Sequence, residues 1–146
     1  MKVKDILAIK GSRVITVEKS TKVYDAMSIF SSNRVGSLLV VDKDDSILGI
    51  IAARDVLMAV VEHYDTIKEL EVDKIMTTNV IVCSEDDNIE YIQAIMTENR
   101  VRHIPILAGK ELKGLISIGD VVKSQLKESH VENKYLNDYI TGKYPG

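Results

Sequence analysis

One short motif occurs twice in the chain, and its second copy places a hydroxyl and a carboxylate where they could contact a ligand. This copy reads GLISIGD from Gly114 to Asp120, with Ser117 three residues before the aspartate. If a helix begins here, its first N–H groups and the serine hydroxyl favour an anion such as phosphate, while the carboxylate accepts hydrogen bonds from hydroxyl groups. The same spacing is that of a capping box, in which both side chains satisfy N–H groups at the helix start. The two roles are compatible, and the sequence leaves both open.

The first copy of the motif differs from the second at four positions, two of which change the groups available to a ligand. It reads GIIAARD from Gly49 to Asp55, so that Ala52 stands where the second copy has a serine and Arg54 stands where it has a glycine. A guanidinium is a good phosphate ligand and could replace the missing hydroxyl, although a surface ion pair is an equally simple role for it. We therefore expect two related but unequal sites.

The repetition extends to the elements that must position these motifs. The triplet that begins at Asn33 recurs at Asn99, and the apolar pattern around it recurs with it. Each copy predicts an extended stretch, an amphipathic helix, two strands joined by a polar turn, and a closing helix. The predicted extended stretches are 14–17 and 80–83, the predicted hairpin strands are 38–41 with 47–51 and 104–107 with 112–116, and the predicted closing helices are 55–64 and 120–128.

These elements predict an α/β (α+β) protein built from two β-α-β-β-α repeats. We expect residues 1–69 to form the first repeat and residues 70–128 the second, packed with pseudo-two-fold symmetry around a cleft. The remaining residues, 129–146, predict a tail with a short helix whose apolar stripe docks on the body or on a partner subunit. A membrane-surface role for that stripe is disfavoured because it is short and its polar face is not strongly basic.

Composition narrows the class of protein. The chain has 146 residues, a hydrophobic fraction of 45% and a net charge of −3, which is typical of a compact globular domain and unfavourable for nucleic-acid binding. The longest apolar run, 56–61, is too short to cross a membrane, and the start lacks an apolar signal core. The single cysteine, Cys83, excludes an internal disulfide and fits a reduced, cytoplasmic location. No spacing indicates a metal site or a catalytic constellation, so we expect no enzyme activity.

The two motif copies, together with the segment NRVRHIPI from Asn99 to Ile106, resemble the CBS domain. Two such units in tandem resemble a CBS pair, or Bateman module, and the resemblance covers Val3 to Leu126. It implies a regulatory module without chemistry of its own, which binds AMP, ADP, ATP, NAD or S-adenosylmethionine in two clefts between the repeats. It also implies a homodimer whose conformation is read by a downstream protein.

The resemblance assigns roles to residues of the first cleft. Asp120 would bind the ribose and Ser117 the phosphate, since a carboxylate suits a sugar diol and a helix start suits an anion. The other repeat would close this cleft with residues of its first extended segment and of its hairpin start: Lys10, Val14, Ile15, Gly36 and Ser37.

The second cleft would use Asp55 for the ribose and Arg54 for the phosphate. Arg102 and His103 would add positive charge from the other repeat, which suits a multiply charged phosphate; His103 could instead simply pack at a strand start. The adenine side would be lined by Thr77, Asn79, Val80 and Ile81.

A second interpretation is a structural dimer whose nucleotide clefts are vestigial, which Ala52 favours for one cleft. An enzyme acting on a nucleotide is a weaker alternative, because no base, nucleophile or metal cluster is apparent.

Overall fold

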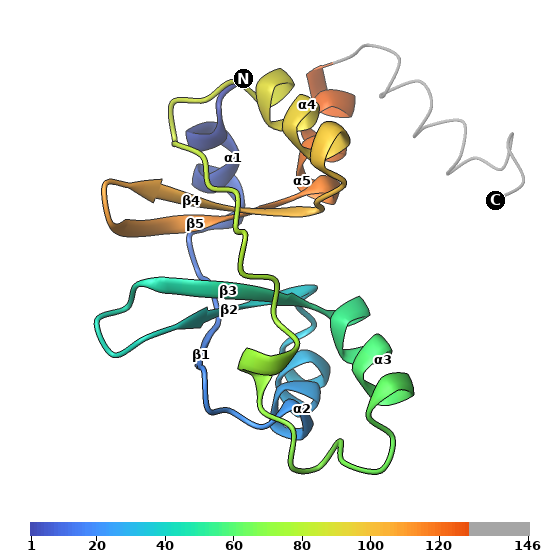
Figure 1. Cartoon of the computed structure of the whole chain (residues 1–146). Helices are drawn as coiled ribbons and strands as arrows, with labels where there is room; N and C mark the ends of the chain where they lie inside the picture. Colours follow the sequence, from blue (N-terminus) through green and yellow to red (C-terminus); the bar gives the residue numbers. More distant parts are fainter. Residues whose placement is uncertain (129–146) are drawn as a thin grey trace, which may run out of the picture. The chain divides into compact units, whose positions relative to one another are not determined.

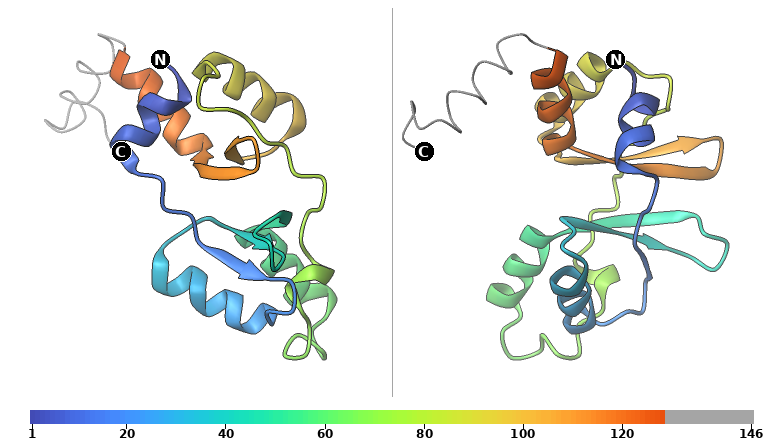
Figure 2. Two further views of the ribbon diagram at one scale, coloured as in Figure 1. Left: turned by 90° about the vertical axis from the view of Figure 1, so that its left-hand side faces the viewer. Right: turned by 180° about the vertical axis from the view of Figure 1, so that it is seen from behind.

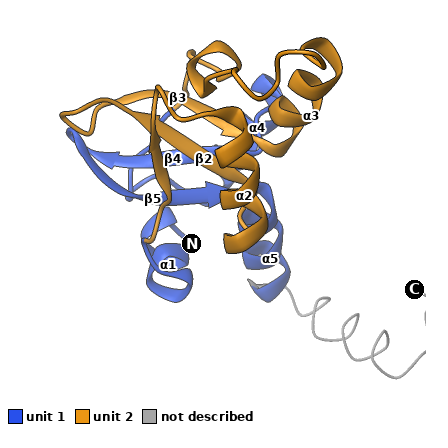
Figure 3. Ribbon diagram, turned by 90° about the horizontal axis from the view of Figure 1, so that it is seen from below, with its two compact units in different colours: residues 1–12, 82–146 blue, residues 13–81 orange. Residues whose placement is uncertain are grey.

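The computed structural model describes residues 1–128, which form two compact units (Figure 3). Unit 1 combines Met1–Ser12 with the chain from Val82 onward, and unit 2 is Arg13–Ile81. The predicted helix of the tail, residues 129–146, lies outside the described residues. No helix in the described part of the chain has both the length and the apolar character needed to span a membrane.

Unit 2 contains a three-stranded sheet in the order β1-β2-β3, with β1 parallel to β2 and β2 antiparallel to β3. Every residue of β2 is buried, and the core joins this strand to the helices on one face of the sheet (Figure 1). The elements are β1 (Thr16–Glu18), α2 (Val23–Asn33), β2 (Ser37–Val41), β3 (Ile47–Ala52), α3 (Ala53–Glu62) and the 3-10 helix η1 (Val72–Lys74).

Unit 1 contains a two-stranded antiparallel sheet with its helices on one face, which is seen from two further sides in Figure 2. Its elements are α1 (Val3–Lys10), α4 (Ile89–Asn99), β4 (His103–Ala108), β5 (Glu111–Ser117) and α5 (Ile118–Glu128). The core is aliphatic and centres on Ile92, Ile104 and Ile116, none of which is exposed. The mixed α/β architecture and both hairpins are as predicted.

The strand predicted over residues 80–83 is wrong. Only Cys83 pairs, through an isolated parallel bridge to Ile106. The chain passes from unit 2 to unit 1 between Ile81 and Val82, so most of this β-branched stretch serves as a connection and has no neighbouring strand in register.

Each unit is completed by a segment that precedes the other repeat in sequence. Helix α1 belongs to unit 1, where the Val3 N–H donates to the Asp87 carbonyl at 3.0 Å. The segment after η1 belongs to unit 2, where Thr77 and Ile50 exchange two backbone hydrogen bonds of 2.9 and 3.0 Å. The compact units therefore do not follow the order of the repeats, and the repeat boundary at residues 69 and 70 stays a prediction about the sequence.

The glycine that opens each motif copy makes this exchange possible. A Cβ on Gly114 would lie 2.6 Å from the Leu7 Cδ2 atom of α1. A Cβ on Gly49 would lie 2.6 Å from the Met76 Sδ atom and 2.8 Å from the Thr77 carbonyl oxygen. These distances are far below van der Waals contact, so the borrowed segments pack directly on the hairpin backbone.

The repeated Asn-Arg-Val triplet ends a helix in both copies. Arg34 and Arg100 follow α2 and α4 in the left-handed conformation, with φ of 51° and 55°. The side-chain amides of Asn33 and Asn99 donate to the carbonyl four residues earlier at 2.9 and 3.0 Å. This part of the repeat thus has a structural role, because it satisfies carbonyl groups that a helix end leaves open.

Gly49→Ala and Gly114→Ala are a matched pair that tests the packing of the borrowed segments. We expect Gly49→Ala to lower the free energy of unfolding by about 2–3 kcal/mol, because the new Cβ meets a backbone carbonyl, and Gly114→Ala by about 1 kcal/mol, because a leucine side-chain end can move. Urea denaturation measures both. In a Leu7→Ala background the cost of Gly114→Ala should shrink while that of Gly49→Ala persists; the absence of this rescue would contradict the packing.

Candidate functional site

The turn between β5 and α5 is closed by the two side chains that the sequence singled out. The Ser117 Oγ accepts a hydrogen bond from the Asp120 N–H at 3.1 Å, and the Asp120 Oδ2 accepts one from the Ser117 N–H at 2.9 Å. The capping box is therefore confirmed. It holds the carboxylate at the positive end of the helix, where a negative charge is favoured.

Lys10, at the end of α1, lies on this carboxylate. Its Nζ is 2.6 Å from the Asp120 Oδ2 and 2.8 Å from the Leu115 carbonyl oxygen. The two charged side chains are 34% and 22% exposed, so the pair is shielded on most sides. The structure thus joins three of the predicted site residues, Lys10, Ser117 and Asp120, in one group.

The charge state of Asp120 follows from these contacts. Burial raises the pKa of Asp120, but the hydrogen bonds from Lys10 and from the Ser117 N–H outweigh burial and hold the pKa below its ordinary value. The carboxylate is therefore ionised at neutral pH. No partner within residues 1–128 occupies its second oxygen, Oδ1, which leaves one acceptor open to a ligand.

Two further predicted residues belong to the same group. His103 stands opposite Ser117 in the register of the β4–β5 hairpin, and the Arg102 carbonyl accepts a hydrogen bond from the Ile118 N–H at 2.9 Å. Burial, with the nearby charges of Lys10 and Arg102, lowers the pKa of His103 although Asp120 opposes this, so the imidazole is neutral at pH 7. Arg102 and His103 lie in unit 1 and Asp55 lies in unit 2, so their predicted meeting in the second cleft stays a prediction.

The first motif copy, in unit 2, forms only half of this arrangement. The Ala52 N–H donates to the Asp55 Oδ2 at 2.8 Å, but no hydroxyl returns the bond. Ser37 faces Ala52 in the β2–β3 register and is 3% exposed, and its Oγ has no hydrogen-bond partner within residues 1–128. Arg54 is exposed, and within the described residues no ion pair involves it.

The predicted clefts each draw residues from both units, and each therefore stays a prediction. Unit 1 holds the group around Asp120 together with Lys10, Arg102 and His103. Unit 2 holds the remaining predicted residues: Val14, Ile15, Gly36, Ser37, Arg54, Asp55, Thr77, Asn79, Val80 and Ile81.

A hollow between α1 and α5 extends the Asp120 group along the helix. It is lined by Lys10 and by apolar residues of α1, and on α5 by Asp120, Lys123, Ser124 and Lys127. Sequence reasoning missed Lys123 and Lys127, although they fall three and seven positions after Asp120 and therefore on the same helix face.

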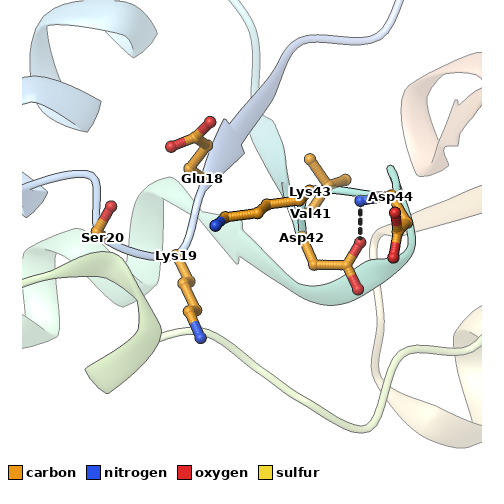
Figure 4. Close-up of a pocket in the computed structure, with 7 residues that line it drawn as sticks. All are labelled: Glu18, Lys19, Ser20, Val41, Asp42, Lys43 and Asp44. Atoms are coloured by element: carbon orange, nitrogen blue, oxygen red, sulfur yellow. Dashed lines mark hydrogen bonds between the residues drawn. The ribbon is translucent and has the colours of Figure 1, made fainter.

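A second hollow, in unit 2, carries no such arrangement. Lys19 and Lys43 share it with Glu18, Asp42 and Asp44 (Figure 4). The Asp42 Oδ1 accepts hydrogen bonds from the N–H groups of Asp44 and Ser46, both at 2.9 Å, so that carboxylate shapes the loop itself. The charges in this hollow are mixed and select no ligand.

Cysteine and metal chemistry are equally unsupported in the described part of the chain. Burial, together with the charge of Asp87, raises the pKa of the Cys83 thiol to about 11, so the thiolate is scarce at neutral pH. Within residues 1–128, no three histidine, cysteine or carboxylate side chains gather as metal ligands would.

The comparison with protein families agrees with the fold. Residues 3–62 and 72–127 each match the CBS domain. These segments make up most of the chain, and the chain therefore belongs to the CBS domain family, with two copies in tandem.

Individual relatives support the same class. The chain is 36% identical over 126 residues to the mitochondrial CBS domain-containing protein CBSX3 of Arabidopsis thaliana, covering 84% of this chain but only 61% of that relative. The CBS-domain containing protein ATU1752 from Agrobacterium tumefaciens has a similar structure, with a TM-score of 0.83, 35% identity and coverage of 86% and 99% of the two chains. CBSX2, whose structure is a complex with AMP, gives a TM-score of 0.72 at 26% identity, with coverage of 86% and 96%.

Exchanging the hydroxyl between the two motif copies tests the capping geometry. Ser117→Ala should lower the free energy of unfolding by about 1 kcal/mol, because the Asp120 N–H loses its acceptor, while Ala52→Ser should raise it by up to the same amount. Urea denaturation is again the measurement. Thr97→Ala is the control, since that exposed hydroxyl donates to the Gln93 carbonyl within α4 and caps no helix start; this variant should change stability by less than about 0.5 kcal/mol. If Ser117→Ala leaves the free energy of unfolding unchanged, the hydroxyl does not cap α5.

Proposed function

We propose that this CBS-pair protein is a regulatory module without catalytic activity that binds an adenosine nucleotide at the turn between β5 and α5. One observation carries the proposal: an ionised carboxylate with an open oxygen lies between a helix N-terminus and a lysine ammonium, at Asp120, Ser117 and Lys10.

This group offers the polar contacts that a nucleotide needs. The Asp120 Oδ1 can accept a hydrogen bond from a ribose hydroxyl, while the N–H groups at the start of α5 and the Lys10 ammonium attract the phosphate. The AMP complex of CBSX2 supports the ligand class, because that protein shares the fold and the family. AMP, ADP, ATP, NAD and S-adenosylmethionine are the candidates, and their common part is the adenosine.

The first motif copy is the weaker site of the two. Asp55 repeats the carboxylate, and Arg54 replaces the hydroxyl as the group that meets a phosphate. The buried Ser37 hydroxyl beside Ala52 lacks a hydrogen-bond partner in the described part of the chain, which supports a polar ligand there, since a buried unpaired hydroxyl costs free energy. Binding at Asp55 is therefore proposed as a second, unequal event.

A homodimer is the assembly we propose for the exposed apolar helix faces. Leu57 and Val61 on α3 are 65% and 73% exposed, and Val122 and Leu126 occupy the equivalent positions on α5. Apolar side chains that repeat at helical spacing on a surface favour burial against a partner. We also propose a cytoplasmic location, because a single cysteine excludes an internal disulfide and so fits a reducing compartment. The downstream partner would be a protein.

The alternative function is a structural dimer with vestigial nucleotide sites. Two observations favour it: Ala52 removes one hydroxyl, and Lys10 already neutralises the Asp120 carboxylate. Nucleotide binding is preferred because an oxygen of Asp120 and a proton of Lys10 stay open.

Thermal unfolding of the full chain with AMP, ADP, ATP, NAD or S-adenosylmethionine tests the proposal. A ligand at a hundred times its dissociation constant stabilises the folded state by about 2.7 kcal/mol, which raises Tm by several degrees. Asp120→Asn should remove most of the shift, and Asp55→Asn a smaller part. Glu98→Gln, on the exposed face of α4, is the matched control and should keep the full shift. No increase with any of the five compounds at millimolar concentration, together with no bound adenine compound after purification, would support the structural dimer instead.

A further inference from the structure

The Lys10 ammonium has more donors than the protein uses. An ammonium carries three N–H groups, and two of them are directed to the Asp120 Oδ2 and the Leu115 carbonyl at 2.6 and 2.8 Å. The third has no acceptor within residues 1–128. Because 34% of this side chain is exposed, the third N–H group is accessible to solvent or to a ligand.

The open donor of Lys10 adjoins an open acceptor. The Asp120 Oδ2 is shared by Lys10 and the Ser117 N–H, while the Oδ1 of the same carboxylate is unoccupied in the described part of the chain. A ligand that satisfies both groups presents a hydrogen-bond donor, such as a hydroxyl, to the carboxylate and an acceptor to the ammonium, for which an anionic oxygen is the strongest. A 5′-phosphorylated nucleoside has both within a few atoms of each other.

The remaining charges around Asp120 favour an anion. The Asp120 carboxylate is already paired with Lys10, and Lys123 and Lys127 line the adjoining hollow. Arg102 adds a positive charge beside His103. The pKa of His103 is lowered, so its imidazole is neutral at pH 7. The local balance is positive, which repels a cationic ligand such as a sulfonium.

We propose that Lys10 is a specificity residue, which makes the Asp120 site select adenosine ligands that carry a phosphate beside the ribose over uncharged adenosine and over the sulfonium of S-adenosylmethionine. This inference rests on the proposed nucleotide binding at Asp120. Lys10 serves as the counter-ion of the carboxylate when the site is free, and shares its charge with the phosphate when the site is filled. The site at the second motif copy would then distinguish adenosine ligands by their charge. The contact between Asp120 and the ribose would by itself bind every adenosine ligand equally well.

Calorimetric titration of the full chain with AMP, adenosine and S-adenosylmethionine tests this selectivity. In the wild type, AMP should bind at least about tenfold more tightly than adenosine, as one charge-assisted hydrogen bond predicts. Lys10→Met should weaken the binding of AMP by roughly that factor, while the affinity for adenosine stays equal or rises. The ratio of the two affinities should therefore approach one. Added salt should also reduce the wild-type ratio.

Three variants separate charge from folding and from nonspecific attraction. Lys10→Gln keeps a polar side chain without the charge and should lose the selectivity as Lys10→Met does, while Lys10→Arg keeps the charge and should retain it. Lys113→Met removes a lysine that pairs with Glu111 on the same unit and should leave the ratio unchanged. If AMP and adenosine both bind and Lys10→Gln preserves their ratio, the role of Lys10 is overturned while nucleotide binding stands. If none of the three compounds binds the wild type, both proposals are overturned.

Discussion

The close approach of a borrowed chain segment to a glycine in each hairpin is the constraint on which both units depend. A hairpin of two strands is marginal by itself and becomes stable when further strands or helices pack on it. Leu7 packs on Gly114 in unit 1, and Met76 packs on Gly49 in unit 2. This packing also has a consequence for function, because it fixes the end of α1 and so delivers the Lys10 ammonium to the carboxylate of Asp120.

The electrostatics of the site then follow from its local structure. The carboxylate at the start of α5 is stabilised by the helix, by the Ser117 N–H and by a cation, so it stays charged although it is partly buried. The first motif copy has the helix and the carboxylate but lacks the hydroxyl, and no lysine among residues 1–128 pairs with Asp55. The exchanges of Ser117 for Ala52 and of Gly119 for Arg54, together with the Lys10 contact from α1, therefore account for the inequality of the two copies.

The sequence predicted most of the fold, because the hairpins and helices depend on local patterns. β-branched runs around a polar turn produced both hairpins, and the spacing of apolar residues produced the helices that follow them. The strand predicted at residues 80–83 failed because its pattern says nothing of a neighbouring strand. The contact between Lys10 and Asp120 spans 110 residues and depends on the exchange of α1, which no local pattern reveals. The position of His103 beside Ser117 was easier to predict from the sequence. Counting residues outward from the hairpin turn places His103 within one residue of its true partner, and the bulge near Leu107 causes the one-residue difference.

An adenosine nucleotide bound at the turn between β5 and α5 would change the surroundings of the backbone N–H groups there. The most direct measurement is a titration of the ¹⁵N-labelled full chain with AMP, followed by the amide resonances in NMR spectra. We expect saturable shifts that are largest for the N–H groups of Ser117 and Asp120 and for the end of α1 at Lys10, with smaller changes around Asp55. Shifts confined to other surfaces, or no saturable shift at millimolar AMP, would contradict binding at this turn.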